Sequence, residues 1–153
     1  MKLAEALLLR ADMQKKLESL RDRIGRNTVV QEGETPAEDP NALLDQVKAI
    51  CRQLKALVFA VNQANLSGKT GKGRTLTEAL AERDALVLQH SIFQSATTSA
   101  AKSAERYGVK EIRWVKVVDV AALQKSVDDL AKSLRELNAE IQEANWQIEV
   151  KEI

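Results

Sequence analysis

The chain has 153 residues, enough for one domain with a hydrophobic core of its own. Hydrophobic residues make up 44% and aromatic residues only 3%, a balance that favours helices rich in Ala, Leu, Lys and Glu over an all-β core. The net charge of +1 provides no global field that would attract a nucleic acid, and we expect no nucleic-acid partner.

The first helix is predicted over about residues 2–24. Its apolar stripe recurs at steps of three and four, the spacing that keeps one face toward a partner helix as in a coiled coil, and Arg10 interrupts this stripe. Gly25 ends the helix, and a short β-prone segment follows at residues 28–31. The stripe consists of Leu3, Ala6, Arg10, Met13, Leu17, Leu20 and Ile24.

The second helix is predicted over about residues 40–65, with Asp39 as the N-cap and Pro40 in the first turn. The third is predicted over about residues 75–106, because Thr75 and Glu78 have the spacing of a capping box. A β-prone insert at residues 112–118 contains Trp114. The fourth helix follows over about residues 120–148, with the most regular apolar stripe of the four.

Four helices of similar length predict one all-α domain over residues 1–153, either an up-down-up-down four-helix bundle or two packed antiparallel hairpins. In the bundle topology both β-prone connections fall at the same end. We therefore expect residues 28–31 and 112–118 to pair as a small two-stranded β ribbon, with Trp114 over the small residues of the third helix. The alternative is that residues 112–118 start the fourth helix early.

The turn "SGKTGKG" between the second and third helices invites comparison with a phosphate-binding loop. It lacks the first glycine of that pattern, since Gln63 stands there inside a helix. A cluster of basic residues on glycine-rich backbone remains, namely Lys69, Lys72 and Arg74. These residues are candidates for contact with a phosphate or an anionic surface, and the alternative is a solvated turn.

Two arginines, Arg10 and Arg83, interrupt apolar stripes at a similar distance from one end of the predicted bundle. Glutamates of the fourth helix fall near the same level, and Glu140 is the first choice among them. We expect Arg10, Arg83 and Glu140 to form an ionic layer, since buried charges must be paired and such layers fix helix register.

Metal and catalytic chemistry have little support in the sequence. His90 and Cys51 are the only histidine and cysteine, and a zinc site needs three or four protein ligands. We therefore interpret Cys51 as a core residue and His90 as a partly buried, hydrogen-bonded one. No cofactor is expected, and no catalytic residue is nominated.

The N-terminus lacks the features of a Sec signal peptide, because Glu5 and Arg10 bracket the apolar run Leu7–Leu9. No uncharged run reaches the roughly 18 residues of a transmembrane helix. A single cysteine fits a reducing compartment. We expect a cytoplasmic protein, secreted only if a non-Sec route exports it.

The sequence resembles the septicolysin-like family of small helical bacterial proteins over nearly its full length. Four segments carry the resemblance: "MKLAEALLLRADMQKKLESLRDRI", "VVQEGETPAEDP", "GRTLTEALAERDAL" and "RWVKVVDVAALQKSVDDLAKSLRELNAEIQEANW". The family name implies a pore-forming cytolysin. The resemblance implies no catalytic or binding residues.

Second apolar stripes lie beside the main ones, with Leu7 and Ala11 on the first helix and Leu80 and Val87 on the third. They exceed what one partner helix would cover. The sequence therefore favours a non-enzymatic interaction protein that forms a homo-oligomer. The alternative is a septicolysin-like cytolysin, in which amphipathic helices turn their apolar faces to a membrane.

Overall fold

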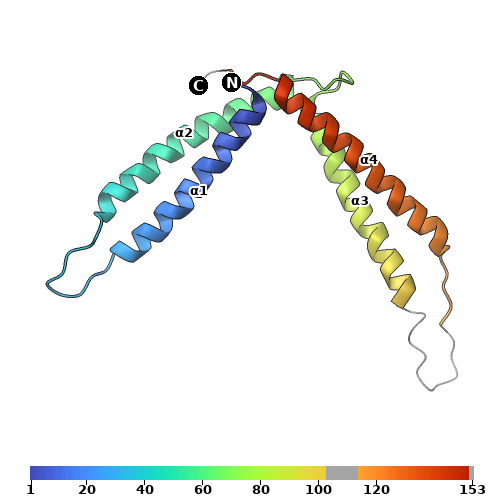
Figure 1. The fold of residues 1–153 in the computed structure, drawn as a ribbon, viewed down its shortest axis with the longest axis horizontal. Coiled ribbons are helices and arrows are strands. Elements are labelled where there is room, and N and C mark those ends of the chain that lie inside the picture. Colours follow the sequence, from blue (N-terminus) through green and yellow to red (C-terminus); the bar gives the residue numbers. More distant parts are fainter. Residues whose placement is uncertain (103–113, 152–153) are drawn as a thin grey trace. The chain divides into compact units, whose positions relative to one another are not determined.

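The computed structural model describes residues 1–102 and 114–151, and these residues form long α-helices joined by loops (Figure 1). The all-α class predicted from the sequence is confirmed. The described helices are α1 (Leu3–Asn27), α2 (Pro40–Ser67), α3 (Leu76–Lys102) and α4 (Val120–Gln147).

Side-chain caps set where three of the helices begin, at the predicted residues. Asp39 accepts a hydrogen bond from the Asn41 backbone N–H at 2.9 Å, with Pro40 as the first residue of α2. At the start of α3 the Thr75 backbone N–H donates to Glu78 at 2.7 Å, and the Glu78 N–H donates to the Thr75 hydroxyl at 3.2 Å. At α4 the Ala122 N–H donates to Asp119 at 3.1 Å.

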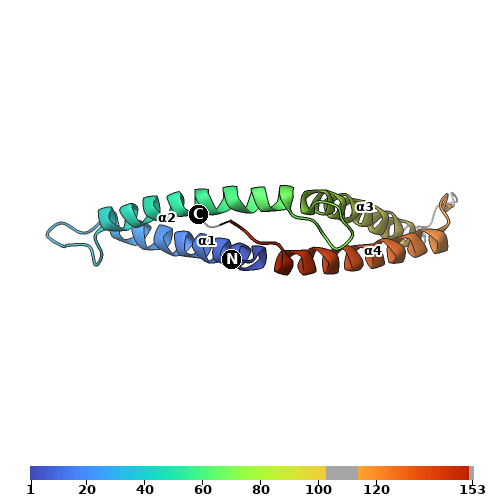
Figure 2. The ribbon, with the colours of Figure 1, turned by 90° about the horizontal axis from the view of Figure 1, so that it is seen from above.

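The chain divides into two compact units, residues 1–69 with 144–153, and residues 70–143. In the first unit α1 and α2 pack side by side and run in opposite directions (Figures 1 and 2). Their facing stripes form a core of Leu20, Leu43 and Ile50, with partly buried Met13, Leu17, Ile24 and Val47 against it. The predicted stripes of the first two helices therefore do face each other.

In the second unit α3 and α4 also lie side by side and antiparallel (Figures 1 and 2). Leu76, Ala79 and Thr97 are buried on α3, and Val127, Leu137 and Ile141 are buried on α4. Each unit is thus built on a helical hairpin in which every helix buries one stripe. The expectation of a single domain over residues 1–153 concerns how the two units pack on each other and stays a prediction.

The predicted β ribbon is not seen. Residues 28–31 form the start of the α1–α2 loop, with Val29 85% exposed, and the described part of the second segment, residues 114–118, carries no strand. Residues 112 and 113 lie outside the described residues, as do 103–106 at the predicted end of the third helix. Trp114 is 73% exposed and does not cover α3. The physical reason is that β propensity states only which residues suit a strand. Residues 28–31 and the described residues 114–118 lie in the connecting loops of two different hairpins, and neither has a partner strand there.

A β contact that was not expected joins the N-terminal and C-terminal segments of the first unit. Lys2 and Glu149 make an isolated antiparallel bridge, in which the Leu3 N–H donates to the Ile148 carbonyl at 2.9 Å and the Val150 N–H to the Met1 carbonyl at 2.9 Å. The Lys2 ammonium lies 3.0 Å from the Glu149 carboxylate. These contacts hold the C-terminal segment against the start of α1.

No helix among the described residues is both long enough and apolar enough to cross a bilayer.

Candidate functional site

Glu140 on α4 is a buried carboxylate that forms ion pairs with Lys72 and Arg74 of the glycine-rich turn before α3. Arg74 binds it through two parallel hydrogen bonds, Nε to Oε1 at 3.0 Å and Nη2 to Oε2 at 2.8 Å. The Lys72 ammonium lies 3.2 Å from Oε2. Arg74 also pairs with Glu82 in the second turn of α3. The Glu140 side chain is only 8% exposed, so this bidentate pair is the best-shielded ion pair among the described residues.

The backbone of the turn brings both cations to the same carboxylate. The Gly73 N–H donates to the Thr70 carbonyl at 2.8 Å, and the Thr70 N–H donates to the Arg74 carbonyl at 2.9 Å. Gly73 has φ +83°, a left-handed conformation that favours glycine. The chain therefore reverses tightly between Thr70 and Arg74, and Lys72 and Arg74 emerge close together over α4.

These contacts shift the pKa of Glu140 from 4.5 to about 2. The hydrogen bonds from Arg74 are the largest cause and outweigh the opposing effect of burial, while Thr70 and Lys72 lower the pKa further. The Thr70 hydroxyl is buried and makes no hydrogen bond of ordinary geometry, so we regard its effect as that of a nearby dipole. Glu140 stays ionised at every physiological pH, and it acts as an anchor for the turn rather than as an acid or base.

The predicted anion-contact residues are therefore divided in their roles. Lys72 and Arg74 are engaged by Glu140, whereas Lys69 is exposed before the turn. The Arg74 side chain is 27% exposed and turned to Glu140, so little of its charge remains for a phosphate, whereas the Lys72 side chain is 69% exposed. The spacing of Lys72 and Arg74 was visible in the sequence, but their acidic partner 66 residues beyond Arg74 was not.

The structure gives Glu140 and Arg83 other partners than the predicted ionic layer does, while the place of Arg10 in such a layer stays a prediction. Glu140 does lie in an ion-pair cluster, but the Arg83 guanidinium pairs with the adjacent Asp84, with Nη2 2.9 Å from Oδ1. Arg10 is half-buried on α1, in the first unit. The reason is local, since the turn before α3 brings Arg74 to Glu140 at the level where the helix-only alignment had placed Arg83.

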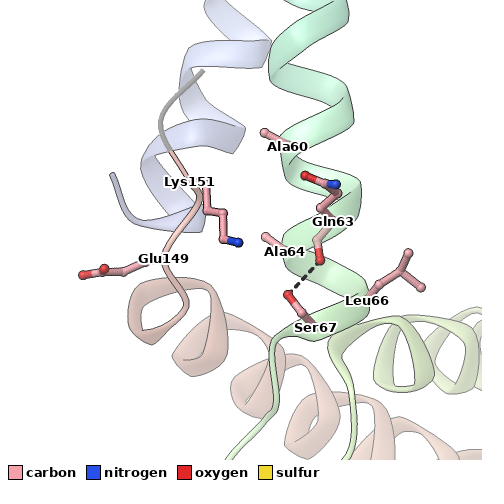
Figure 3. Close-up of a pocket in the computed structure, with 7 residues that line it drawn as sticks. All are labelled: Ala60, Gln63, Ala64, Leu66, Ser67, Glu149 and Lys151. Atoms are coloured by element: carbon pink, nitrogen blue, oxygen red, sulfur yellow. Dashed lines mark hydrogen bonds between the residues drawn. The ribbon is translucent and has the colours of Figure 1, made fainter.

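A small cavity lies in the first unit, between the last turns of α2 and the C-terminal segment (Figure 3). Its volume is about 310 Å³, and Ala60, Gln63, Ala64, Leu66, Ser67, Glu149 and Lys151 line it. Lys151 extends toward α2, whereas Glu149 points away from it, and the Ser67 hydroxyl donates to the Gln63 carbonyl at 2.9 Å (Figure 3). The lining holds no paired nucleophile and base.

Among the described residues no group of three or more His, Cys, Asp and Glu side chains could hold a metal ion. Cys51 is exposed, which corrects its interpretation as a core residue. It follows Ile50 in the sequence, and one helical step of about 100° carries it off the buried stripe. His90 is half-buried, in the intermediate position expected from the sequence.

Large apolar side chains are exposed on the helix faces that point away from the hairpin cores. On α2 these are Phe59 at 63% and Leu66 at 65%; on α3, Leu88 at 63% and Ile92 at 57%. The second stripes noted in the sequence are only partly outward, because Leu7, Ala11 and Leu80 are half-buried while Val87 is 50% exposed. Sequence reasoning missed the outermost residues because it searched beside the main stripes rather than opposite them.

Comparisons with known proteins extend over almost the whole chain. A family model described as a family of unknown function (DUF6847) matches residues 10–150. A crystal structure of a functionally unknown conserved protein from Corynebacterium diphtheriae is similar with a TM-score of 0.91 and 32% identity, covering 99% of each chain. No curated protein matches the chain.

Proposed function

We propose that this chain, which belongs to a family of unknown function (DUF6847), is a non-enzymatic helical protein that assembles with copies of itself. The observation that supports it most is the exposure of Leu88 and Ile92, at 63% and 57%, on the outward face of α3. Contiguous apolar surface on a folded protein is typical of interaction sites. A two-helix hairpin buries one stripe per helix, so a second apolar stripe favours a further partner.

The polar chemistry is consistent with a scaffold rather than a catalyst. Glu140, which has the largest pKa shift among the described residues, is held in a structural ion-pair cluster, and the cavity in the first unit has no side chain arranged as a nucleophile beside a base. A cytoplasmic location belongs to this proposal, since a single cysteine fits a reducing compartment.

The second candidate function is that of a septicolysin-like cytolysin, and the outward face of α2 favours it. Arg52 and Lys55 precede Phe59 and Leu66 at steps of three, four and seven, so cations and large apolar groups share one exposed face. This composition is typical of helices that lie on anionic membranes. Pore formation would follow only if the hairpins also opened.

Multi-angle light scattering over a concentration series tests the first proposal. We expect the mean mass to rise from the 16.9 kDa of one chain toward twice that value as the concentration increases. A constant monomer mass up to about 1 mM would reject self-assembly.

Dye release from vesicles of phosphatidylglycerol and phosphatidylcholine tests the second candidate, and we expect the vesicles to stay intact at neutral pH. Leakage that Phe59→Ser abolishes would favour the cytolysin instead.

A further inference from the structure

The outward face of α3 carries a second heptad stripe without a charged residue. We name it the outer seam, and it consists of Ala81, Ala85, Leu88, Ile92, Ser95 and Ser99. Successive members are four, three, four, three and four residues apart, the spacing of a coiled-coil contact, and all six are exposed. At about 100° per residue the seam lies opposite Ala79 and Thr97, which face the hairpin core. α3 therefore has apolar residues on two opposite faces, and α4 covers one of them.

We propose that the outer seam binds the outer seam of a second copy of this chain, with the two α3 helices antiparallel and a two-fold axis level with His90. This inference rests on the proposed function and specifies its interface. Residues at equal distances from position 90 then meet. Leu88 packs against Ile92 of the second copy, Ala85 against Ser95, and Ala81 against Ser99. Each of these layers combines small or apolar side chains, and each pair occurs twice, as a two-fold interface requires.

Charges at the ends of α3 select the antiparallel direction. Glu78 lies in the first turn of the helix and Lys102 in the last, and both are twelve residues from position 90. The antiparallel pairing places Glu78 of each copy beside Lys102 of the other, whereas a parallel pairing places like charges together at both ends. The antiparallel arrangement also sets the helix dipoles in opposite directions.

The flanks of the seam agree with this register. Glu82 and Asp84 are the acidic residues beside it, and in their own copy they already pair with Arg74 and Arg83. Across the interface both meet uncharged residues of the second copy: Glu82 meets Thr98, and Asp84 meets Ala96. The Thr98 hydroxyl already donates a hydrogen bond to the Gln94 carbonyl at 3.0 Å, so it brings no unpaired donor to the contact. No like-charge pair forms along the flanks.

The size of the seam sets the expected strength. Residues 81–99 span about 27 Å of helix at 1.5 Å per residue, so the contact is smaller than that of an obligate dimer. We expect a reversible dimer with a dissociation constant on the order of micromolar.

Sedimentation equilibrium of three proteins tests which face associates. They are the wild type, the double variant Leu88→Ser/Ile92→Ser, and the matched control Phe59→Ser/Leu66→Ser, which removes two equally exposed residues from α2. We expect the α3 variant to weaken dimerisation by about tenfold or more and the α2 variant to leave it unchanged. Circular dichroism checks that each variant keeps its helices, and a variant that loses helix is replaced by Leu88→Gln/Ile92→Gln or Phe59→Gln/Leu66→Gln.

The outcomes separate this inference from the function on which it rests. A wild type that stays monomeric at about 1 mM overturns both. A wild type that dimerises equally well after the α3 substitutions overturns only the outer seam, and self-assembly through another face stands.

Disulfide trapping tests the register. In a Cys51→Ser background, Ala85→Cys with Ser95→Cys should give a covalent dimer under mild oxidation, because these positions face each other across the axis. The control Ala81→Cys with Ser95→Cys is offset by about one helical turn and should link much less. A dimer trapped by Ala85→Cys alone would indicate parallel helices and contradict the proposal.

Discussion

At the scale of single residues, one buried carboxylate organises the turn before α3. Glu140 holds Arg74 in a bidentate pair and Lys72 at 3.2 Å, and it links α4 to the turn by contacts that a helix-only alignment does not foresee. Burying one charge is unfavourable unless its partner meets it with matched geometry, so the cluster depends on both members being present.

A double-mutant cycle checks which arginine is the partner. Arg74→Ala and Glu140→Gln should show a coupling free energy of about 1 to 3 kcal/mol in chemical denaturation, because each substitution breaks the same bidentate ion pair. Arg83→Ala with Glu140→Gln serves as the control and should be additive within about 0.5 kcal/mol. Equal coupling of both arginines to Glu140 would refute the assignment.

The lowered pKa of Glu140 makes stability depend on acid pH. A carboxylate whose folded pKa is about 2, against 4.5 ordinarily, stabilises the fold above about pH 4.5, and this contribution is lost as the pH falls through 2. The lowered pKa values of Glu38 and Glu149 add to the same trend. The difference in unfolding free energy between wild type and Glu140→Gln isolates Glu140.

This difference should shrink by about 2 to 3 kcal/mol between pH 5 and pH 2. Glu136→Gln removes a carboxylate from the exposed side of α4 and is the control for the loss of one negative charge. A wild-type minus Glu140→Gln difference that is independent of pH would show that the carboxylate is not anchored.

At the scale of elements, helix starts were predictable and loop conformations were not. Asp39, Thr75 and Asp119 cap α2, α3 and α4 because capping acts within one turn and is written in adjacent residues. The β-prone segments at 28–31 and 112–118 need a partner strand, which no local pattern specifies. The bridge between Lys2 and Glu149 was missed for the same reason.

The exposed position of Trp114 leads to a prediction about the α3–α4 loop. Trp114→Ala should change the unfolding free energy by less than about 1 kcal/mol, since a side chain that is 73% exposed leaves no large cavity when truncated. Val127→Ala, a buried residue of α4, is the contrasting variant and should cost about 1 to 3 kcal/mol. Chemical denaturation compares the two, and a cost for Trp114→Ala as large as that for Val127→Ala would place Trp114 in a packed contact.

At the scale of the whole molecule, the sequence predicted the class and the helix pairing but not the site. The main stripes meet inside each hairpin, as Leu20 and Ile50 illustrate. The partners of Glu140 and the outward direction of Leu88 and Ile92 depend on the rotation of each helix about its own axis. An apolar stripe with half-buried edges does not fix that rotation. The central proposal is that another copy of the chain covers the second apolar face of α3.

Solvent exposure of the Leu88 and Ile92 methyl groups tests this most directly. It is measured as the methyl NMR relaxation caused by a soluble gadolinium chelate, below and above the dimerisation concentration. We expect relaxation at Leu88 and Ile92 to fall as the concentration rises, while Val29, 85% exposed in a loop, stays strongly relaxed and buried Leu137 stays protected throughout. Leu88 and Ile92 methyl groups that are relaxed equally at both concentrations would contradict the account.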